Sequence, residues 1–176
     1  DVIGCHEAGI SRAIATCGTA LTKEHVRKMS RFAKKVILAF DADNAGQSAA
    51  EKVYEWESEF DLLFKVADLP KGQDPGDLAF SDPDELNRIV ESAKPHMQFR
   101  VDRVLEKGDF ETKEGRAKAA IDAMKVIVQH PDELIRDQYI VQIADKCLIS
   151  ADEIRRRASQ ENFKTEESIT VREVVP

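Results

Sequence analysis

The sequence predicts an α/β region followed by an all-α region. In the first 80 residues, short apolar segments alternate with segments of helical spacing, which is the order expected of βαβ units and a mostly parallel sheet. One apolar segment, residues 36–40, is an unbroken Val-Ile-Leu-Ala-Phe run, typical of a strand buried on both faces of such a sheet. After residue 80 only helical spacing remains, and its apolar stripes predict a C-terminal helical bundle.

Two short signals mark the ends of elements in the first region. Gly18 would end the apolar strand that precedes it, and Thr22 is a suitable N-cap for a helix whose apolar residues follow at helical spacing. In chain order we expect the end of a strand–helix unit over 1–9, a strand over 13–18, a helix over 22–33, a strand over 36–40, a helix over 44–60 and a strand over 62–67.

Caps and prolines delimit the helices of the second region. Asp82, Pro83 and Glu85 are typical of a helix start, with a capping side chain, proline at the first position and an acid at the third. Pro95 is expected to break or kink that helix. Later helix starts are expected at Thr112, Pro131 and Ser150.

We therefore expect three parts: a metal-binding α/β domain over residues 1–80, a helical subdomain over 81–160, and a polar linker or tail over 161–176. The 176 residues suffice for one domain with a substantial core or for two small ones. Because the chain begins with Asp1 rather than Met, inside what looks like an interrupted structural unit, we expect it to be a fragment of a longer protein.

The composition limits the choice of function. The chain is 42% hydrophobic and 34% charged, and its net charge of −7 argues against a broad nucleic-acid-binding face. Three cysteines without a C-x-x-C pattern favour a reducing compartment over a disulfide framework or a zinc knuckle. No apolar run approaches the roughly 20 residues of a membrane span, so we expect a cytoplasmic protein with no membrane partner.

Two aspartates follow the 36–40 run, where the predicted strand would end. Asp41 and Asp43 are two residues apart, so on an extended backbone their carboxylates project the same way. Ligands of open α/β sheets bind at this edge, and Mg²⁺ suits carboxylates that share it with substrate phosphates. Gly46 would allow close approach of backbone or phosphate. Alternatively, Asp43 caps the next helix and Asp41 is merely solvated.

A second acidic segment follows the strand predicted over 62–67. The loop over 69–77 carries Asp74 and Asp77 and would lie at the same edge of a parallel sheet as Asp41 and Asp43, so that four carboxylates could converge. The alternative is a solvated turn in which Asp74 only caps. Nearer the end of the chain, Arg155, Arg156 and Arg157 form either a nucleic-acid patch or, more commonly, a solvated helix face.

Five segments together resemble the bacterial DNA primases. Ala-Thr-Cys-Gly-Thr-Ala-Leu-Thr, Ala-Phe-Asp-Ala-Asp-Asn-Ala-Gly and Leu-Pro-Lys-Gly-Gln-Asp-Pro resemble the metal-binding TOPRIM domain of that family. Glu-Gly-Arg-Ala and Pro-Asp-Glu-Leu-Ile-Arg-Asp-Gln-Tyr resemble the helical subdomain that follows it. The segments lie at residues 15–22, 39–46, 69–75, 114–117 and 131–139.

The resemblance implies synthesis of short RNA primers on a single-stranded DNA template from ribonucleoside triphosphates, with Mg²⁺ or Mn²⁺. By motif match, Asp41, Asp43 and Asp74 would be catalytic metal ligands. Asp1 fits the last residue of a Glu-Gly-Tyr-x-Asp motif whose catalytic Glu would precede this chain. Asp77 is a further candidate, because Asp-Pro-Gly-Asp replaces the commoner Asp-Pro-Asp of the family.

The family's other domains are expected outside this chain. They are an N-terminal zinc-binding domain, the basic half of the polymerase domain, and a C-terminal domain through which the replicative helicase would bind. Two alternatives stay open: another TOPRIM enzyme, such as a type IA topoisomerase or an OLD-type nuclease, and a non-catalytic interaction module. A topoisomerase needs a tyrosine nucleophile, and Tyr54 and Tyr139 both occupy positions of helical packing.

Overall fold

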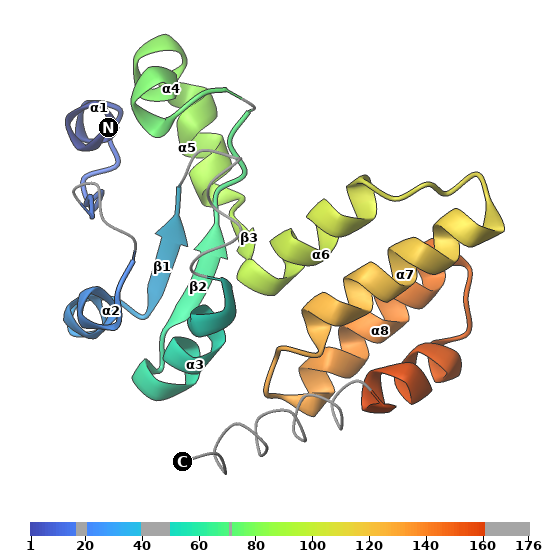
Figure 1. Cartoon of the computed structure of the whole chain (residues 1–176). Helices are drawn as coiled ribbons and strands as arrows, with labels where there is room; N and C mark the ends of the chain where they lie inside the picture. Colours follow the sequence, from blue (N-terminus) through green and yellow to red (C-terminus); the bar gives the residue numbers. More distant parts are fainter. Residues whose placement is uncertain (17–20, 40–49, 71, 161–176) are drawn as a thin grey trace, which may run out of the picture. The chain divides into compact units, whose positions relative to one another are not determined.

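The computed structural model describes residues 1–16, 21–39, 50–70 and 72–160, with side chains of the third range described from residue 53. These residues form two compact units that divide after Phe99, and each is traced by colour in Figure 1. None of the helices among the described residues is long and apolar enough to cross a membrane.

The first unit is built on a small mixed sheet. β1 and β2 pair in parallel, with Leu38 opposite Val66, and β2 pairs with β3 antiparallel, with Val66 opposite Lys94. A parallel pair needs a crossover connection, and a helix lies between the two strands in the chain. The strands are β1 (Lys35–Leu38), β2 (Leu63–Val66) and β3 (Lys94–Pro95).

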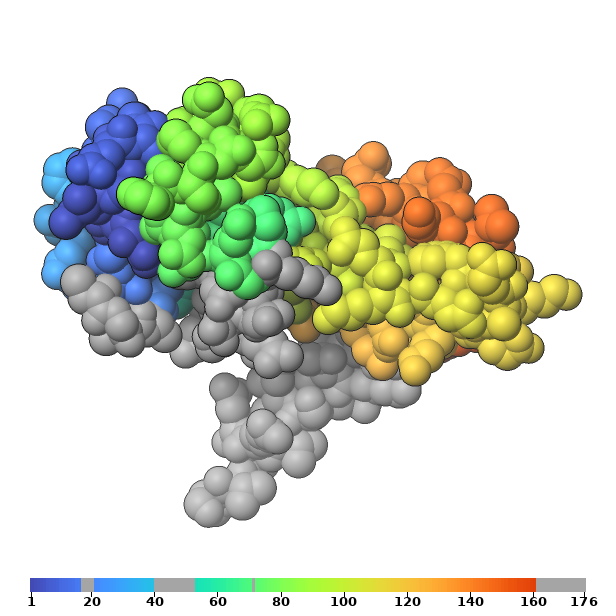
Figure 2. Space-filling model, turned by 90° about the horizontal axis from the view of Figure 1, so that it is seen from above, coloured from blue at the N-terminus to red at the C-terminus, as the bar shows by residue number. Residues whose placement is uncertain are grey.

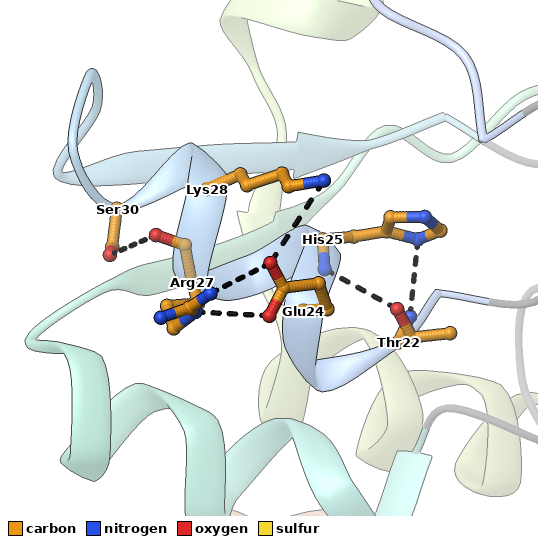
Figure 3. Close-up of polar contacts among 6 residues, drawn as sticks. All are labelled: Thr22, Glu24, His25, Arg27, Lys28 and Ser30. Carbon is orange, nitrogen blue, oxygen red and sulfur yellow. Dashed lines mark hydrogen bonds and ion pairs between the residues drawn. The ribbon is translucent and has the colours of Figure 1, made fainter.

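Short helices accompany this sheet, and three of them, α2, α4 and α5, have side-chain caps. Thr22 caps α2 as the sequence predicts: its Oγ1 accepts from the backbone N–H of His25, whose Nδ1 accepts from the backbone N–H of Thr22 (Figure 3). Asp82 caps α5 through the N–H of Glu85. The helices are α1 (Val2–Glu7), α2 (Lys23–Met29), α3 (Ala50–Phe60), α4 (Pro75–Ser81), α5 (Pro83–Glu91) and the start of α6 (His96–Glu106).

Two apolar clusters hold the first unit together. One packs α2 and α3 on the sheet, and the other packs α1 against α4 and α5, which positions the start of α4. The fully buried Val26, Val53 and Phe64 lie in the first cluster, while Cys5, Leu78 and Leu86 lie in the second.

The second unit is helical. Thr112 Oγ1 accepts from the N–H of Gly115 to cap α7, and Asp132 Oδ1 caps α8 through the N–H groups of Leu134 and Ile135. A left-handed Leu148 (φ 55°) ends α8. The helices are the rest of α6, α7 (Lys113–Ile127), α8 (Glu133–Cys147) and a helix over residues 151–160. Buried Ala, Ile and Met side chains join α7 to α8, as predicted for a bundle.

The predicted class, an α/β region followed by helices, is confirmed, but four local expectations were wrong. The helix expected over 22–33 ends at Met29, so Phe32 and Ala33 lie beyond it. Residues 13–16 form no strand, and the remainder of the strand expected there lies outside the described residues. α4 begins at Pro75, inside the segment expected to be a loop. β3 is a strand after residue 80, where none was expected, because a two-residue strand ending in proline has no detectable periodicity.

The division between the compact units also differs from the expected position. The sequence placed the end of the α/β domain at residue 80, whereas the units divide after Phe99. α5 packs with α4, and β3 completes the sheet, so residues 81–99 belong with the first unit. The boundary was expected too early because the amphipathic pattern of α5 does not indicate whether its apolar face packs on a helical bundle or on an α/β unit.

A candidate metal site on the first unit

Of the three principal predicted ligands, the structure describes Asp74. Asp41, Asp43 and Gly46 lie outside the described residues. What the structure does describe is the strand that leads to them: β1 ends at Leu38, whose C=O accepts from the N–H of Ala67 at 2.9 Å. The carboxyl ends of β1 and β2 are therefore paired side by side, which is the edge where the sequence analysis expected the carboxylates to meet.

Asp74 follows β2 and is fixed by the start of α4. Gly72 turns the chain with φ +76°, and Asp74 then takes an extended backbone conformation. Its Oδ1 accepts from the backbone N–H of Asp77 at 2.7 Å, and Pro75 occupies the first helical position, where its missing N–H costs nothing. The capping alternative for Asp74 is therefore realised, but this bond leaves its second oxygen, Oδ2, available for other partners.

An open hollow of about 450 Å³ lies where α1 meets α4. In Figure 2 the surface of α1 (blue) lies directly against that of α4 (green). The lining of the hollow includes four acidic residues and no Lys, Arg or His. The lining residues are Asp1, Gly4, Glu7, Asp74, Gly76, Asp77, Ala79 and Phe80.

Gly76 lets the carboxylates of Asp1 and Asp74 come close together. A Cβ built on Gly76 would lie 2.7 Å from Asp1 Oδ1 and 3.2 Å from Asp74 Oδ1. The first distance is shorter than side-chain atoms tolerate, so any larger residue would displace the Asp1 carboxylate. The two oxygens thus flank a point that only glycine leaves open.

The chemistry of this hollow suits a hard divalent cation, since carboxylate oxygens are the ligands that Mg²⁺ and Mn²⁺ prefer. Two like charges around Gly76, with no basic side chain in the lining, repel each other unless a cation lies near them. Among the described residues, however, no three His, Cys, Asp or Glu side chains are arranged to hold a metal. Asp1, Asp74 and Asp77 therefore fit a metal site in chemistry, but do not complete one by themselves.

Two features of the hollow escaped the sequence analysis. Glu7 carries no motif and joins the lining only because α1 packs on α4. The helix start at Asp74–Pro75, by contrast, had the same signal as Asp82–Pro83, namely a capping acid followed by proline. Reading the earlier pair as a helix start would have placed Asp77 in the first turn of α4.

The arginine run of the second unit resembles a solvated helix face rather than an open basic patch. Arg155 donates to Asp137 at 2.6 Å and to Asp152 at 2.8 Å. Arg156 and Arg157 both donate to Glu153, at 2.8 and 2.7 Å. Carboxylates thus neutralise all three guanidinium groups, which leaves little charge for phosphates.

Comparisons with known proteins agree with these observations. A Toprim-like family model matches residues 1–79. The DNA primase of Streptomyces coelicolor is 34% identical over 150 residues, covering 82% of this chain and 23% of that protein, and that of Clostridium acetobutylicum is 33% identical over 147 residues, covering 83% and 24%. The chain thus spans about a quarter of the length of these relatives.

The fold has a close counterpart. The crystal structure of the RNA polymerase domain of Mycobacterium tuberculosis primase DnaG, in complex with double-stranded DNA, superposes with a TM-score of 0.70 and 30% identity, over 85% of this chain and 49% of that one. A model described as the DnaB-helicase binding domain of primase matches residues 97–151. The segment that resembles a helicase-binding domain therefore lies within this chain, whereas helicase contacts were expected in a domain outside it.

Both matched segments, residues 1–79 and 97–151, are described by primase-related family models, and the family implies use of a divalent metal ion. On the sequence and the fold, this chain belongs to the bacterial DNA primase family.

Proposed function

We propose that this chain is the metal-binding and adjoining helical part of a DNA primase, which synthesises short RNA primers on single-stranded DNA from ribonucleoside triphosphates. The observation that carries the proposal is that Asp1, Asp74 and Asp77 line one hollow where α1 meets α4. Family membership supports the same conclusion.

In this proposal Asp41, Asp43 and Asp74 are the principal ligands of Mg²⁺ or Mn²⁺, and Asp1 and Asp77 are further ligands. When bound, the cations offset the negative charge that develops on the attacking and leaving oxygens of nucleotidyl transfer. Gly46 would let the backbone or a phosphate come close.

The chain's own residues also make nucleotide binding depend on the cation. A triphosphate is strongly anionic, and the hollow presents four acidic side chains without a basic one. The hollow therefore repels a bare nucleotide and admits it only with a divalent cation. The small Gly76 keeps room for that cation between Asp1 and Asp74.

The rest of the enzyme is proposed to come from other segments of the longer protein. Because this chain spans about a quarter of its relatives and has a net charge of −7, we expect it to make no primers alone. Zn²⁺ is expected only in a separate N-terminal domain. Residues 97–151 are the candidate contact for a replicative helicase.

A structural role for Asp74 is the competing explanation, because its Oδ1 already caps α4. Under that explanation the hollow would be a solvated surface, and the chain an interaction module. Both explanations predict that Asp74 stabilises α4, but only the first predicts that divalent cations bind there.

Cation titration separates the two. Manganese binding to the intact chain, followed by the electron paramagnetic resonance of free Mn²⁺, should weaken at least tenfold in an Asp41→Ala, Asp43→Ala double variant, since two principal ligands are lost. Asp84→Ala, Glu91→Ala, which removes two exposed carboxylates from α5, is the charge-matched control and should bind like the wild type. Equal affinities in all three proteins would contradict the proposed site.

A further inference from the structure

The segment from α2 to β1 is the most basic part of the described chain. Between residues 22 and 35 there are six lysines and arginines and a single carboxylate, Glu24, although the whole chain has a net charge of −7. The cations are Lys23, Arg27, Lys28, Arg31, Lys34 and Lys35. None of them lines the acidic hollow.

About half of this positive charge is neutralised. Figure 3 shows the Arg27 guanidinium paired with Glu24, through Nε at 3.0 Å and Nη2 at 2.9 Å, while Lys28 Nζ remains 3.9 Å from the same carboxylate. Lys23 binds Glu59 at 2.7 Å, and Lys34 binds Asp61 at 2.7 Å. Three carboxylates therefore offset three of the six cations.

The remaining charge is concentrated at the end of α2. Arg31 and Lys35 form no ion pair within the part of the chain that the structure describes, and both are exposed. Lys28 adds a weakly bound third cation. The local surplus matches the phosphates of a nucleic acid backbone rather than an acidic metal pocket.

An exposed aromatic residue lies among these cations in the sequence. Phe32 is 89% exposed, although it follows directly after Arg31 and lies three residues before Lys35. The turn that carries it is ordered by N–H groups of Phe32 and Ala33 that donate to Met29 C=O at 2.9 and 3.0 Å. An exposed ring with cationic residues before and after it in the chain suits the stacking of an unpaired base while its phosphates are bound.

We propose that Arg31, Phe32 and Lys35, assisted by Lys28, form a contact site for single-stranded DNA on the first unit. A base would stack on Phe32, and flanking phosphates would bind Arg31 and Lys35. A duplex hides its base faces, so the exposed ring favours a single strand. The choice of DNA over RNA rests on the proposed function, in which the template is single-stranded DNA.

The test is the binding of a fluorescein-labelled dT20 to the intact chain, measured by anisotropy in EDTA, without nucleotides and over a series of salt concentrations that starts low. Phe32→Ala should weaken binding about tenfold, and Phe32→Trp should restore it. Arg31→Gln, Lys35→Gln should reduce the slope of log affinity against log salt by about 1.4, since each phosphate contact contributes about 0.7 for single strands.

Matched controls leave the site intact. Lys113→Gln, Lys118→Gln changes the net charge equally on exposed positions of α7, and Leu134→Ala removes an exposed apolar side chain from α8. Both controls should bind dT20 like the wild type. No measurable dT20 binding, or equal losses in site and control variants, would overturn the proposal. Tighter binding of rU20 or of a DNA duplex, or equal competition by polyglutamate, would also overturn it.

Because this assay contains no metal and no nucleotide, its outcome is independent of catalysis. If the longer protein makes primers while Phe32→Ala leaves dT20 affinity unchanged, the contact site fails and the proposed function stands. If dT20 binds as expected but the longer protein makes no primers, the contact site stands and the proposed function fails.

Discussion

The acidic hollow of the first unit and the arginine run of the second unit are both clusters of like charge, but only the second is neutralised. Arg155, Arg156 and Arg157 each donate to a carboxylate, and Glu153 holds two of them. No basic side chain lines the hollow that Asp1 and Asp74 share. Like charges that the fold brings together without an opposite charge repel each other, which is why the hollow, rather than the arginine run, indicates a function.

The two charge clusters lie in different compact units, which we expect to unfold separately. Phe64→Ala in the first core and Ile127→Ala in the second remove fully buried side chains, at a cost of about 3–5 and 2–5 kcal/mol. If the units fold separately, each substitution lowers the midpoint of one transition in differential scanning calorimetry and leaves the other unchanged. A single transition that both substitutions shift would contradict the division after Phe99.

The next largest effect concerns Asp74, which has one structural and one proposed catalytic task. Asp74→Asn keeps a side chain that caps α4 well but removes the charge, so it should fold like the wild type and lose activity. We expect primer synthesis by the longer protein to fall about 100-fold, as for loss of one charge-stabilising group. Asp74→Ala should lose the same activity and, in addition, about 1 kcal/mol of stability.

Asp77 provides the control within the same helix turn. Its backbone N–H, not its side chain, is used by the cap, so Asp77→Ala leaves the cap in place. As a further ligand it should cost less activity than Asp74→Asn. A larger loss of activity for Asp77→Ala would show that Asp77, rather than Asp74, provides the main functional carboxylate.

Glu57, in the first unit, should have a smaller effect on stability, and that effect depends on pH. Burial raises its pKa, even though its Oε1 accepts from the backbone N–H of Phe64 at 2.8 Å, which lowers it. Since the folded state binds the proton more tightly, stability is highest below the unfolded pKa and falls as pH rises through the folded pKa.

Glu57→Gln keeps an acceptor for Phe64 and removes the buried charge. We expect urea denaturation at pH 7 to occur at a higher midpoint in the variant, and the difference to disappear at about pH 4. Glu57→Ala, which also loses the acceptor, should be less stable than the wild type at both pH values. An unchanged midpoint for Glu57→Gln at pH 7 would contradict the raised pKa.

Glu153 should give the smallest effect on stability, because it is exposed to solvent and screened. Hydrogen bonds from Arg156 and Arg157 lower its pKa to about 2. Its contribution to stability is therefore present above the unfolded value of about 4.3 and is lost as pH falls toward 2. Carboxyl NMR titration should show its midpoint rising in Arg156→Gln, Arg157→Gln. An unchanged midpoint would show that the pairs are not populated in solution.

Sequence predicted the elements whose signal is local. The caps at Thr22, Asp82 and Thr112 and the parallel β1–β2 pair could be inferred because each depends on a few adjacent residues or on one apolar run. β3 could not be inferred, since a two-residue strand exists only through its partner Val66.

For the candidate site, sequence predicted the residues better than their arrangement. Motif and strand position led to Asp1, Asp74 and Asp77, and the structure brings these three to one hollow. Their role as metal ligands remains a prediction, and Asp41 and Asp43 lie outside the described residues. Glu7 could not be predicted, because it arrives through the packing of α1 on α4, which depends on apolar residues remote in the chain.

The parallel pairing of β1 with β2 also has a consequence in time. Leu38 can meet Val66 only after the whole connection between them has been closed, whereas the partners in the second unit are neighbouring helices joined by short turns. Contacts between distant residues form slowly, and contacts between near ones form quickly. The helical unit, though it is synthesised after the first unit, should therefore reach its native state sooner, and the strands that lead to the candidate site should assemble after it.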